Sequence, residues 1–364
     1  MRQLAETDLL DLATGAALLG TGGGGSPYVG RLLAAQAIRA TGPVDVVDLE
    51  ELRDDALVVL AAMMGAPTVM AEKLPSGHEI GSALDALQDR LGRTITHLAP
   101  AEIGGINSMI PCAAAAARRL PLVDADAMGR AFPEVQMVTP TIYGISAAPL
   151  ALADEKGNVV VLETVDNLWM ERLARAVTVQ MGSTSLIASY AMSGADARRC
   201  LVPRTLTLAH ELGALVRAAR AAGDDVANAV AQRLCGDRLF DGKVTDVERR
   251  TEGGFARGTA SIEGIGADAG SMLELTFQNE HLLAARDGVV VTTVPDLIIV
   301  VDTETGAAIT TEDLRYGSRV TVLAARCDAQ WRTDAGLGVA GPRCFGLDMD
   351  FVPAGSYPAT TAGD

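Results

Sequence analysis

The segment Ala56-Leu-Val-Val-Leu-Ala-Ala-Met-Met64, followed by Gly65-Ala-Pro-Thr68, is a continuous apolar run that ends at a turn signal. Strands of a parallel sheet are covered on both faces, so they read as unbroken apolar runs and not as alternating ones. We therefore predict a buried parallel strand at this position, with helices packed on both of its faces.

Helical and strand-like segments alternate on both sides of this run, which is typical of an α/β layer with a mostly parallel sheet. Further helices and strands follow up to residue 235. The strands expected over 135–145 and 151–162 could be antiparallel. The expected helices span residues 4–19, 28–40, 81–91, 110–119, 168–179, 206–221 and 224–234. The expected strands span residues 44–49, 56–64, 94–99, 120–123, 135–145, 151–162 and 184–192.

The pattern changes after Gly236, where helical periodicity stops and short β-prone segments are separated by glycine and aspartate turns. Such spacing predicts a small barrel or sandwich. The expected strands here span residues 244–250, 255–263, 272–279, 281–286, 289–294, 297–301 and 319–325.

A chain of 364 residues is longer than a single hydrophobic core usually supports, so two domains are expected. The predicted fold class is an α/β domain with a mostly parallel sheet plus a C-terminal, mainly-β, barrel-like domain. We predict the α/β domain over 1–172 and the C-terminal domain over 173–352, followed by a flexible tail over 353–364. The C-terminal domain divides into a helical lead-in (173–235) and the barrel-like part (236–352).

Charge and hydropathy exclude several classes of protein. The net charge of −16 repels phosphate backbones, so nucleic-acid binding is not expected. No apolar run reaches the roughly 18–20 residues that span a bilayer, and the polar start of the chain does not read as a signal peptide. We expect a cytoplasmic protein with reduced cysteines that, like many enzymes of this size, forms a homo-oligomer.

The segment from Val123 to Met137 concentrates acidic and basic side chains directly after an apolar strand, where α/β proteins place ligand sites. Asp124 and Asp126 could act as a general base or bind a divalent metal. Arg130 fits a clamp for a carboxylate or an oxyanion, and Glu134 could orient one of the others. The alternative for these residues is structural, as helix caps and ion pairs. No other cofactor is expected.

The glycine tract Gly22, Gly23, Gly24 and Gly25 lies between two predicted helices, where bare backbone amides could approach an anion. A second turn, with Gly104, Gly105 and Asn107, could complete an anion hole. The first tract matches neither phosphate-binding fingerprint, because no Gly-Lys-Ser/Thr follows it and a helix, not a strand, precedes it. Nucleotide binding is therefore the weaker reading, and a flexible turn is the structural one.

Asn279 and Glu280 interrupt an apolar strand just before His281. Violations of a local pattern concentrate at functional sites, so we expect both side chains to contact a ligand. The structural alternative is a polar bulge at the rim of the barrel. The four histidines share no metal-binding spacing, which makes a histidine-rich zinc site unexpected.

These segments resemble the S-methyl-thiohydantoin desulfurase family, whose members are sometimes fused to, or found beside, hydantoinase/oxoprolinase proteins. The similarity covers about residues 5 to 352 in the same order. The motifs that carry it are Thr21-Gly-Gly-Gly-Gly25, Gly104-Gly-Ile-Asn107, Asp124-Ala-Asp-Ala-Met-Gly-Arg-Ala-Phe-Pro-Glu-Val-Gln136, Phe277-Gln-Asn-Glu280 and Pro295-Asp-Leu-Ile298.

The resemblance implies an α/β domain followed by a barrel-like domain, in agreement with the patterns above. It also implies hydrolytic removal of sulfur, as a thiol, from a five-membered thiohydantoin ring. The other reading of the resemblance is a non-catalytic, ligand-binding or regulatory partner of a hydantoinase/oxoprolinase-type enzyme. It stays open because no recognisable nucleophile–base motif is present.

Overall fold

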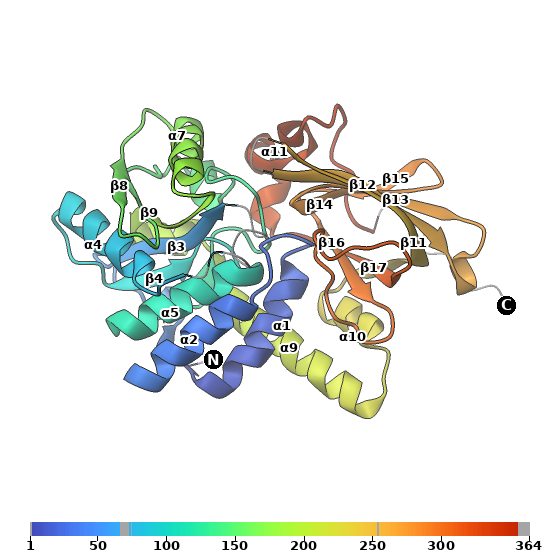
Figure 1. Ribbon diagram of the computed structural model, residues 1–364, viewed down its shortest axis with the longest axis horizontal. Helices are drawn as coiled ribbons and strands as arrows, with labels where there is room; N and C mark the ends of the chain where they lie inside the picture. The colour runs from blue at the N-terminus through green and yellow to red at the C-terminus, as the bar shows by residue number, and fades with distance from the viewer. Residues whose placement is uncertain (1, 66–72, 74, 253–254, 356–364) are drawn as a thin grey trace.

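The computed structural model describes residues 2–65, 73, 75–252 and 255–355. Two sheets lie side by side, and helices pack beneath and between them (Figure 1). The first sheet has the order β1-β2-β5-β4-β3-β9-β7-β8. Its strands are β1 (Gln3–Leu4), β2 (Val44–Val47), β3 (Leu57–Gly65), β4 (His97–Pro100), β5 (Leu122–Val123), β7 (Leu150–Ala153), β8 (Val159–Leu162) and β9 (Thr184–Ser193).

The predicted buried strand forms the centre of this sheet. β3 pairs in parallel with β4 and antiparallel with β9, and the parallel pairs β2–β5 and β5–β4 complete a parallel core. Val59 and Ala61 on β3 face one apolar core, while Leu60 and Ala62 face the other. The unbroken apolar run is thus explained, because both faces of β3 are buried.

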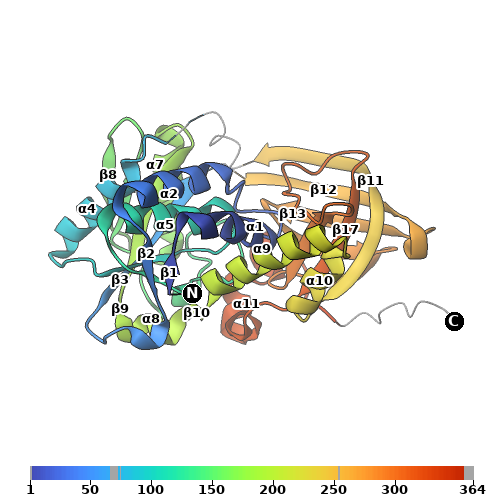
Figure 2. The same cartoon turned by 90° about the horizontal axis from the view of Figure 1, so that it is seen from below.

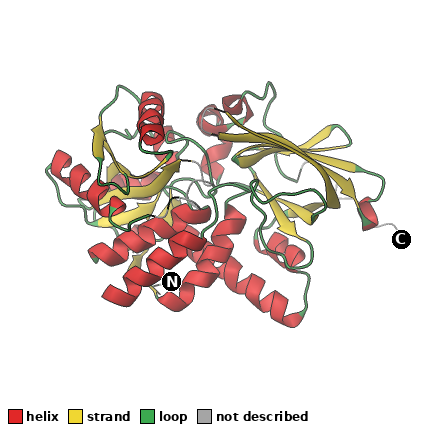
Figure 3. Cartoon of the chain, viewed as in Figure 1, coloured by secondary structure: helices red, strands yellow, loops and turns green. Residues whose placement is uncertain are grey.

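Helices cover both faces of this sheet (Figure 3). α1 (Leu9–Leu19), α2 (Tyr28–Thr41), α4 (Glu79–Leu91) and α5 (Met109–Arg118) contribute to the core on one face. α7 (Asn167–Gln180) and α8 (Gly194–Cys200) contribute to the core on the other face. The long helix α9 (Thr205–Ala222) packs on α1, and α10 (Val226–Arg233) follows it towards the second sheet (Figure 2).

The second sheet is antiparallel and curls into a half-barrel, in the order β15-β14-β13-β12-β11-β17-β16. Its inner face encloses a separate core that includes Phe240, Ile262 and Leu275. Its strands are β11 (Asp237–Glu252), β12 (Phe255–Gly264), β13 (Met272–Gln278), β14 (Glu280–Arg286), β15 (Val289–Thr293), β16 (Leu297–Asp302) and β17 (Arg319–Ala325). A two-stranded sheet pairs β6 (Ala125–Asp126) with β10 (Val202–Pro203).

The predicted fold class is confirmed, with an α/β layer and a mainly-β second part. The second part is a single curled sheet and neither a closed barrel nor a sandwich. Residues 151–162 form the antiparallel hairpin β7–β8. Most of the expected tail, residues 356–364, lies outside the described residues.

One predicted strand is wrong. Residues 135–145 form turns and the short helix α6 (Thr139–Ile142), with Pro140 in its first turn. Met137 and Val138 are buried in this loop, so their apolar character reflects packing on the core beside α7 and not a strand. The helices α8 and α11 (Asp334–Ala340) were not predicted.

Nowhere in the described part of the chain is a helix long and apolar enough to cross a membrane.

The contact between α1 and α9 depends on two glycines. A Cβ on Gly15 would lie 1.8 Å from the carbonyl oxygen of Ala209, and a Cβ on Gly213 would lie 1.8 Å from that of Asp11. Since the obstacles are backbone atoms, the two helices would have to separate to accept a side chain.

We expect Gly15→Ala and Gly213→Ala each to lower the free energy of unfolding by roughly 1–3 kcal/mol, the range of overpacked cores. Urea denaturation measures this change. Gly338→Ala in α11 is the matched control, because its Cβ would meet nothing within 4 Å. Its stability should stay equal or rise, since alanine favours a helix. Equal effects at Gly15 and Gly338 would contradict the close packing.

Candidate active site

Arg130 connects the two sheets. Its Nη1 donates hydrogen bonds to the carbonyl oxygens of Pro295 (2.8 Å) and Asp296 (2.7 Å), which immediately precede β16. Its Nη2 donates to Oγ1 of Thr21 (2.8 Å), at the start of the glycine tract. The guanidinium also lies 4.6 Å from the ring centre of Phe132. The fully buried side chain therefore joins segments that are far apart in sequence.

Asp124 and Asp126 are buried and accept hydrogen bonds from neighbouring segments. Asp124 accepts from the backbone N–H (3.0 Å) and hydroxyl (2.5 Å) of Thr207, in the first turn of α9. Asp126 accepts from the backbone amides of Ile103 (2.8 Å) and Gly129 (2.9 Å). Burial raises the pKa of Asp126 to about 7. Both carboxyls hold loops in place.

The described residues contain no group of three or more histidine, cysteine, aspartate or glutamate side chains arranged to hold a metal ion.

The glycine tract is packed against β14. A Cβ on Gly22 would lie 2.5 Å from Cε1 of His281, and one on Gly23 would lie 2.1 Å from Oε1 of Glu280. On its other side, the tract meets the turn of residues 104–105, because a Cβ on Gly105 would lie 2.2 Å from the carbonyl oxygen of Gly24. The glycines thus permit three segments to meet without side chains between them.

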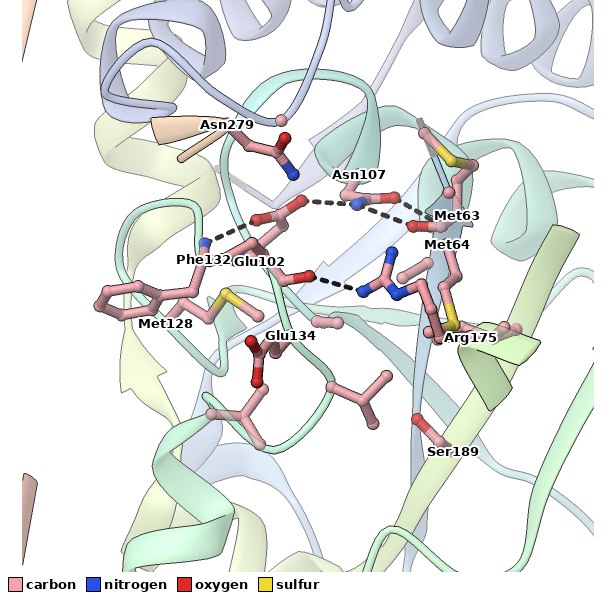
Figure 4. Close-up of a pocket in the computed structure, with 18 of the residues that line it drawn as sticks. Met63, Met64, Glu102, Asn107, Met128, Phe132, Glu134, Arg175, Ser189 and Asn279 are labelled. Atoms are coloured by element: carbon pink, nitrogen blue, oxygen red, sulfur yellow. Dashed lines mark hydrogen bonds between the residues drawn. The ribbon is translucent and has the colours of Figure 1, made fainter. Parts of the chain in front are cut away.

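A pocket lies between the first sheet and the tip of the β13–β14 hairpin. Figure 4 shows Glu102 hydrogen-bonded to Asn107, with Asn279 on one side and Glu134 on the other. Polar groups gather near Glu102, and methionine and phenylalanine side chains complete the wall. The lining residues are Gly24, Ala62, Met63, Met64, Gly65, Ala101, Glu102, Asn107, Met128, Phe132, Pro133, Glu134, Val135, Val138, Arg175, Ile187, Ser189, Tyr190, Asn279 and Glu280.

Glu102 lies two residues beyond the carboxyl end of β4 and is 5% exposed. It accepts hydrogen bonds from Nδ2 of Asn107 (2.5 Å) and from the backbone N–H of Phe132 (3.2 Å). Asn107 is itself held by Met63 on β3, whose backbone N–H donates to Oδ1 at 2.6 Å. Burial raises the pKa of the Glu102 carboxyl to about 8, and the nearby charge of Asp126 adds to this shift.

Glu280 begins β14 and brings a second buried carboxyl to the pocket. Its Oε2 is shielded from solvent and has no hydrogen-bond partner among the described residues. Burial raises the pKa of Glu280 well above its usual value, and the charge of Glu102 raises it further. Two carboxyls in one low-dielectric site disfavour the doubly ionised state, so a proton is retained between them.

Asn279 forms the tip of the hairpin between β13 and β14 with a left-handed backbone (φ 58°). The backbone N–H of Ala256 donates to its Oδ1 at 2.9 Å, which ties the tip to β12. The other end of the pocket holds Glu134 and Arg175. Arg175 on α7 donates to Glu171 (2.7 Å) and to the carbonyl oxygen of Pro133 (2.8 Å). Burial raises the pKa of Glu134, whose carboxyl accepts from Gln136.

The pocket combines several of the predicted site residues from both halves of the chain, namely Gly24, Asn107, Glu134, Asn279 and Glu280. The other candidates lie outside the pocket wall, and their contacts are those of packing and hydrogen bonding between segments. These are Asp124, Asp126, Arg130, Gly22, Gly23, Gly25, Gly104 and Gly105.

Sequence reasoning did not select Glu102 and Arg175. The sequence did indicate Glu102, because it follows a predicted strand and precedes Gly104-Gly105. Asp124 stands in the same position after the next strand. Arg175 had no such signal, because a basic residue on an amphipathic helix is ordinarily solvent-facing.

Comparison with known proteins places the chain in one family. The family model described as the S-Me-THD-like N-terminal domain matches residues 7–164, and the S-Me-THD-like C-terminal domain matches residues 165–354. β9 falls in the second match, although it pairs with β3 in the first sheet.

A crystal structure of a protein from Chromobacterium violaceum superimposes with a TM-score of 0.80 and 26% identity, over 97% of this chain and 99% of that one. No match was found among curated proteins.

The raised pKa of Glu102 predicts a pH-dependent stability. In the folded protein the carboxyl keeps its proton up to about pH 8, whereas the ordinary pKa of a glutamate side chain is 4.5. The stabilisation that the protonated carboxyl gives the folded protein is therefore fully present below the pKa of the unfolded state. It is lost as the pH rises through the pKa of the folded state. The melting temperature of the wild type should fall relative to that of Glu102→Gln between about pH 5 and about pH 9. Glu274→Gln, at an exposed side chain of β13, should instead follow the wild type. Parallel curves for wild type and Glu102→Gln would contradict the shift.

Proposed function

Because the chain belongs to the S-methyl-thiohydantoin desulfurase-like family, we propose that it is a hydrolase that replaces an alkylthio group on a five-membered thiohydantoin ring with oxygen. In this reaction the oxygen of water forms a bond to the ring carbon between the two nitrogens, and the carbon–sulfur bond breaks. Of the two protons of water, one ends on a ring nitrogen and the other on the released thiol. The reaction needs a base, an acid and a site that excludes other water.

The observation that carries the proposal is the pair of buried carboxyls, Glu102 and Glu280, in one pocket. Glu102 accepts two hydrogen bonds from N–H donors, which favour its ionised form. Glu280 has an oxygen that accepts no hydrogen bond from the described part of the chain, which favours the protonated form. The pair holds one proton once Glu102 loses its own towards pH 8, and Glu102 is then the general base for the attacking water. Glu280 is the general acid for the ring nitrogen or the leaving sulfur.

The remaining wall of the pocket suits the alkylthio group. Met64, Met128 and Phe132 are buried and present polarisable, apolar surface. Thioether and aromatic groups make favourable contacts with sulfur. The carboxyls of Glu102 and Glu280 face the same pocket and match the hydrogen-bonding edge of the ring.

We expect the purified chain alone to release methanethiol from an S-methyl-thiohydantoin in an amount equal to the substrate consumed. Headspace gas chromatography is the suitable measurement, because the exposed free cysteines Cys235 and Cys344 would react with thiol reagents. Glu102→Gln and Glu280→Gln should each lower kcat/KM by roughly 10²–10⁴, the range for loss of a general acid or base. Glu274→Gln should keep wild-type turnover.

Two results would contradict the proposal. Ligand binding without thiol release by the isolated chain would favour the non-catalytic partner of a hydantoinase/oxoprolinase-type enzyme. Full turnover by both glutamine variants would place the acid–base chemistry on other residues.

A further inference from the structure

The backbone and the side-chain oxygen of Asn279 hold the turn between β13 and β14. The backbone N–H of Asn279 donates to the carbonyl oxygen of Ala256 at 2.8 Å, and the N–H of Ala256 donates back to Oδ1 at 2.9 Å. The carbonyl oxygen of Asn279 accepts from the hydroxyl of Thr311 at 2.5 Å. The side-chain nitrogen Nδ2 takes no part in this arrangement, because no described residue accepts a hydrogen bond from it.

The next hairpin contains the same arrangement with an aspartate. Asp287, between β14 and β15, has a left-handed backbone (φ 49°) like that of Asn279 (φ 58°). Its backbone N–H donates to the carbonyl oxygen of Met272 at 2.9 Å, and the N–H of Met272 donates back to its Oδ1 at 2.8 Å. Both residue types tolerate this backbone conformation. A carboxylate oxygen therefore suffices for such a turn, and the turn does not require the nitrogen of Asn279.

The two residues differ in what surrounds them. Asp287 is exposed, whereas Asn279 lines the pocket that holds Glu102 and Glu280. Because a backbone N–H needs an oxygen as acceptor, the bond from Ala256 fixes Oδ1 towards β12 and leaves Nδ2 on the other side of the amide. Figure 4 shows this nitrogen pointing towards Glu102. The pocket thus contains an N–H donor whose orientation is set from outside the pocket.

We propose that Nδ2 of Asn279 donates a hydrogen bond to the carbonyl oxygen of the bound ring and selects rings that have this carbonyl group. The carbonyl meant is the one on the carbon that does not carry sulfur, and it stands next to a ring nitrogen. The inference rests on the proposed function, which supplies the ring. Asn279 and Glu280 line the same pocket, so its wall offers a donor for the carbonyl and a carboxyl for the nitrogen.

The same hydrogen bond assists the reaction. When water attacks the carbon between the two nitrogens, electron density moves onto the nitrogens and, through amide conjugation, onto the carbonyl oxygen. A fixed N–H donor at that oxygen stabilises the charge that develops there. A ring without the carbonyl leaves the amide of Asn279 unpaired in the pocket, and sites built to bind a polar group reject analogues that lack it.

Isothermal titration calorimetry with two neutral rings tests the proposal on the full chain. Hydantoin has the carbonyl group, whereas imidazolidin-2-one lacks it and keeps the carbonyl between the two nitrogens. The wild type should bind hydantoin roughly 10- to 100-fold more tightly, which is the effect of one hydrogen bond in a buried site. Asn279→Asp keeps the oxygen that Ala256 needs, and Asn279→Gly keeps the left-handed backbone. Both variants should lose the preference for hydantoin.

Asp287→Gly is the matched control, because it removes a side-chain oxygen from an equivalent turn outside the pocket. It should keep the wild-type preference. The proposal is overturned if the wild type binds hydantoin no more tightly than imidazolidin-2-one, or if either Asn279 variant keeps the preference. Loss of the preference in Asp287→Gly would also overturn it, because the preference would then depend on the turns and not on Nδ2.

Release of methanethiol by the wild type separates this inference from the proposed function. If the wild type releases the thiol and the Asn279 variants keep the preference for hydantoin, the inference fails and the proposed function stands. If the wild type releases no thiol but its preference depends on Asn279, the proposed function fails and the contact with the ring stands.

Discussion

The structure depends on one buried cation, the guanidinium of Arg130, which binds backbone carbonyl groups just before β16 and a side chain of the glycine tract. Burial lowers the pKa of Arg130 to about 10, so the group stays charged at neutral pH. An unpaired buried charge is costly, and the surrounding oxygen atoms offset that cost only in this arrangement of segments. The position of β14 relative to the first sheet follows from it, because the carbonyl of His281 lies 3.4 Å from the same guanidinium.

The pocket is a consequence of this arrangement. Glu102 and Asn107 come from the turn after β4, whereas Asn279 and Glu280 come from the tip of a hairpin in the second sheet. Neither half of the chain contains the pair of carboxyls by itself. The glycine tract lies between them, and its missing side chains allow Glu280 to approach. Holding two carboxyls in a buried pocket lowers the stability of the folded protein. Acid–base sites with shifted pKa values usually contain titratable groups that are buried in this way.

Much of the fold could be predicted from the sequence, because a strand that is buried on both faces has an unbroken apolar sequence, such as Ala56–Met64. The loop over 135–145 could not be predicted. Met137 and Val138 are apolar because they pack on the core of the folded protein, and the segment has no helical or strand periodicity. In the candidate site, the polar interruption at Asn279 and Glu280 was visible as a break in a strand pattern. The sequence showed Arg130 only as one of several charged residues in the segment from Val123 to Met137. Whether a guanidinium faces a ligand or a carbonyl of a distant segment depends on long-range packing, which local sequence does not encode.

The central claim is that Glu102 and Glu280 face the same bound ring, and a crystal structure with the hydantoin product tests it most directly. The account predicts the ring between the two carboxyls, with the new carbonyl oxygen or an adjacent ring nitrogen within hydrogen-bonding reach of each. A ring bound outside this pocket, or bound with either carboxyl out of reach, would contradict it.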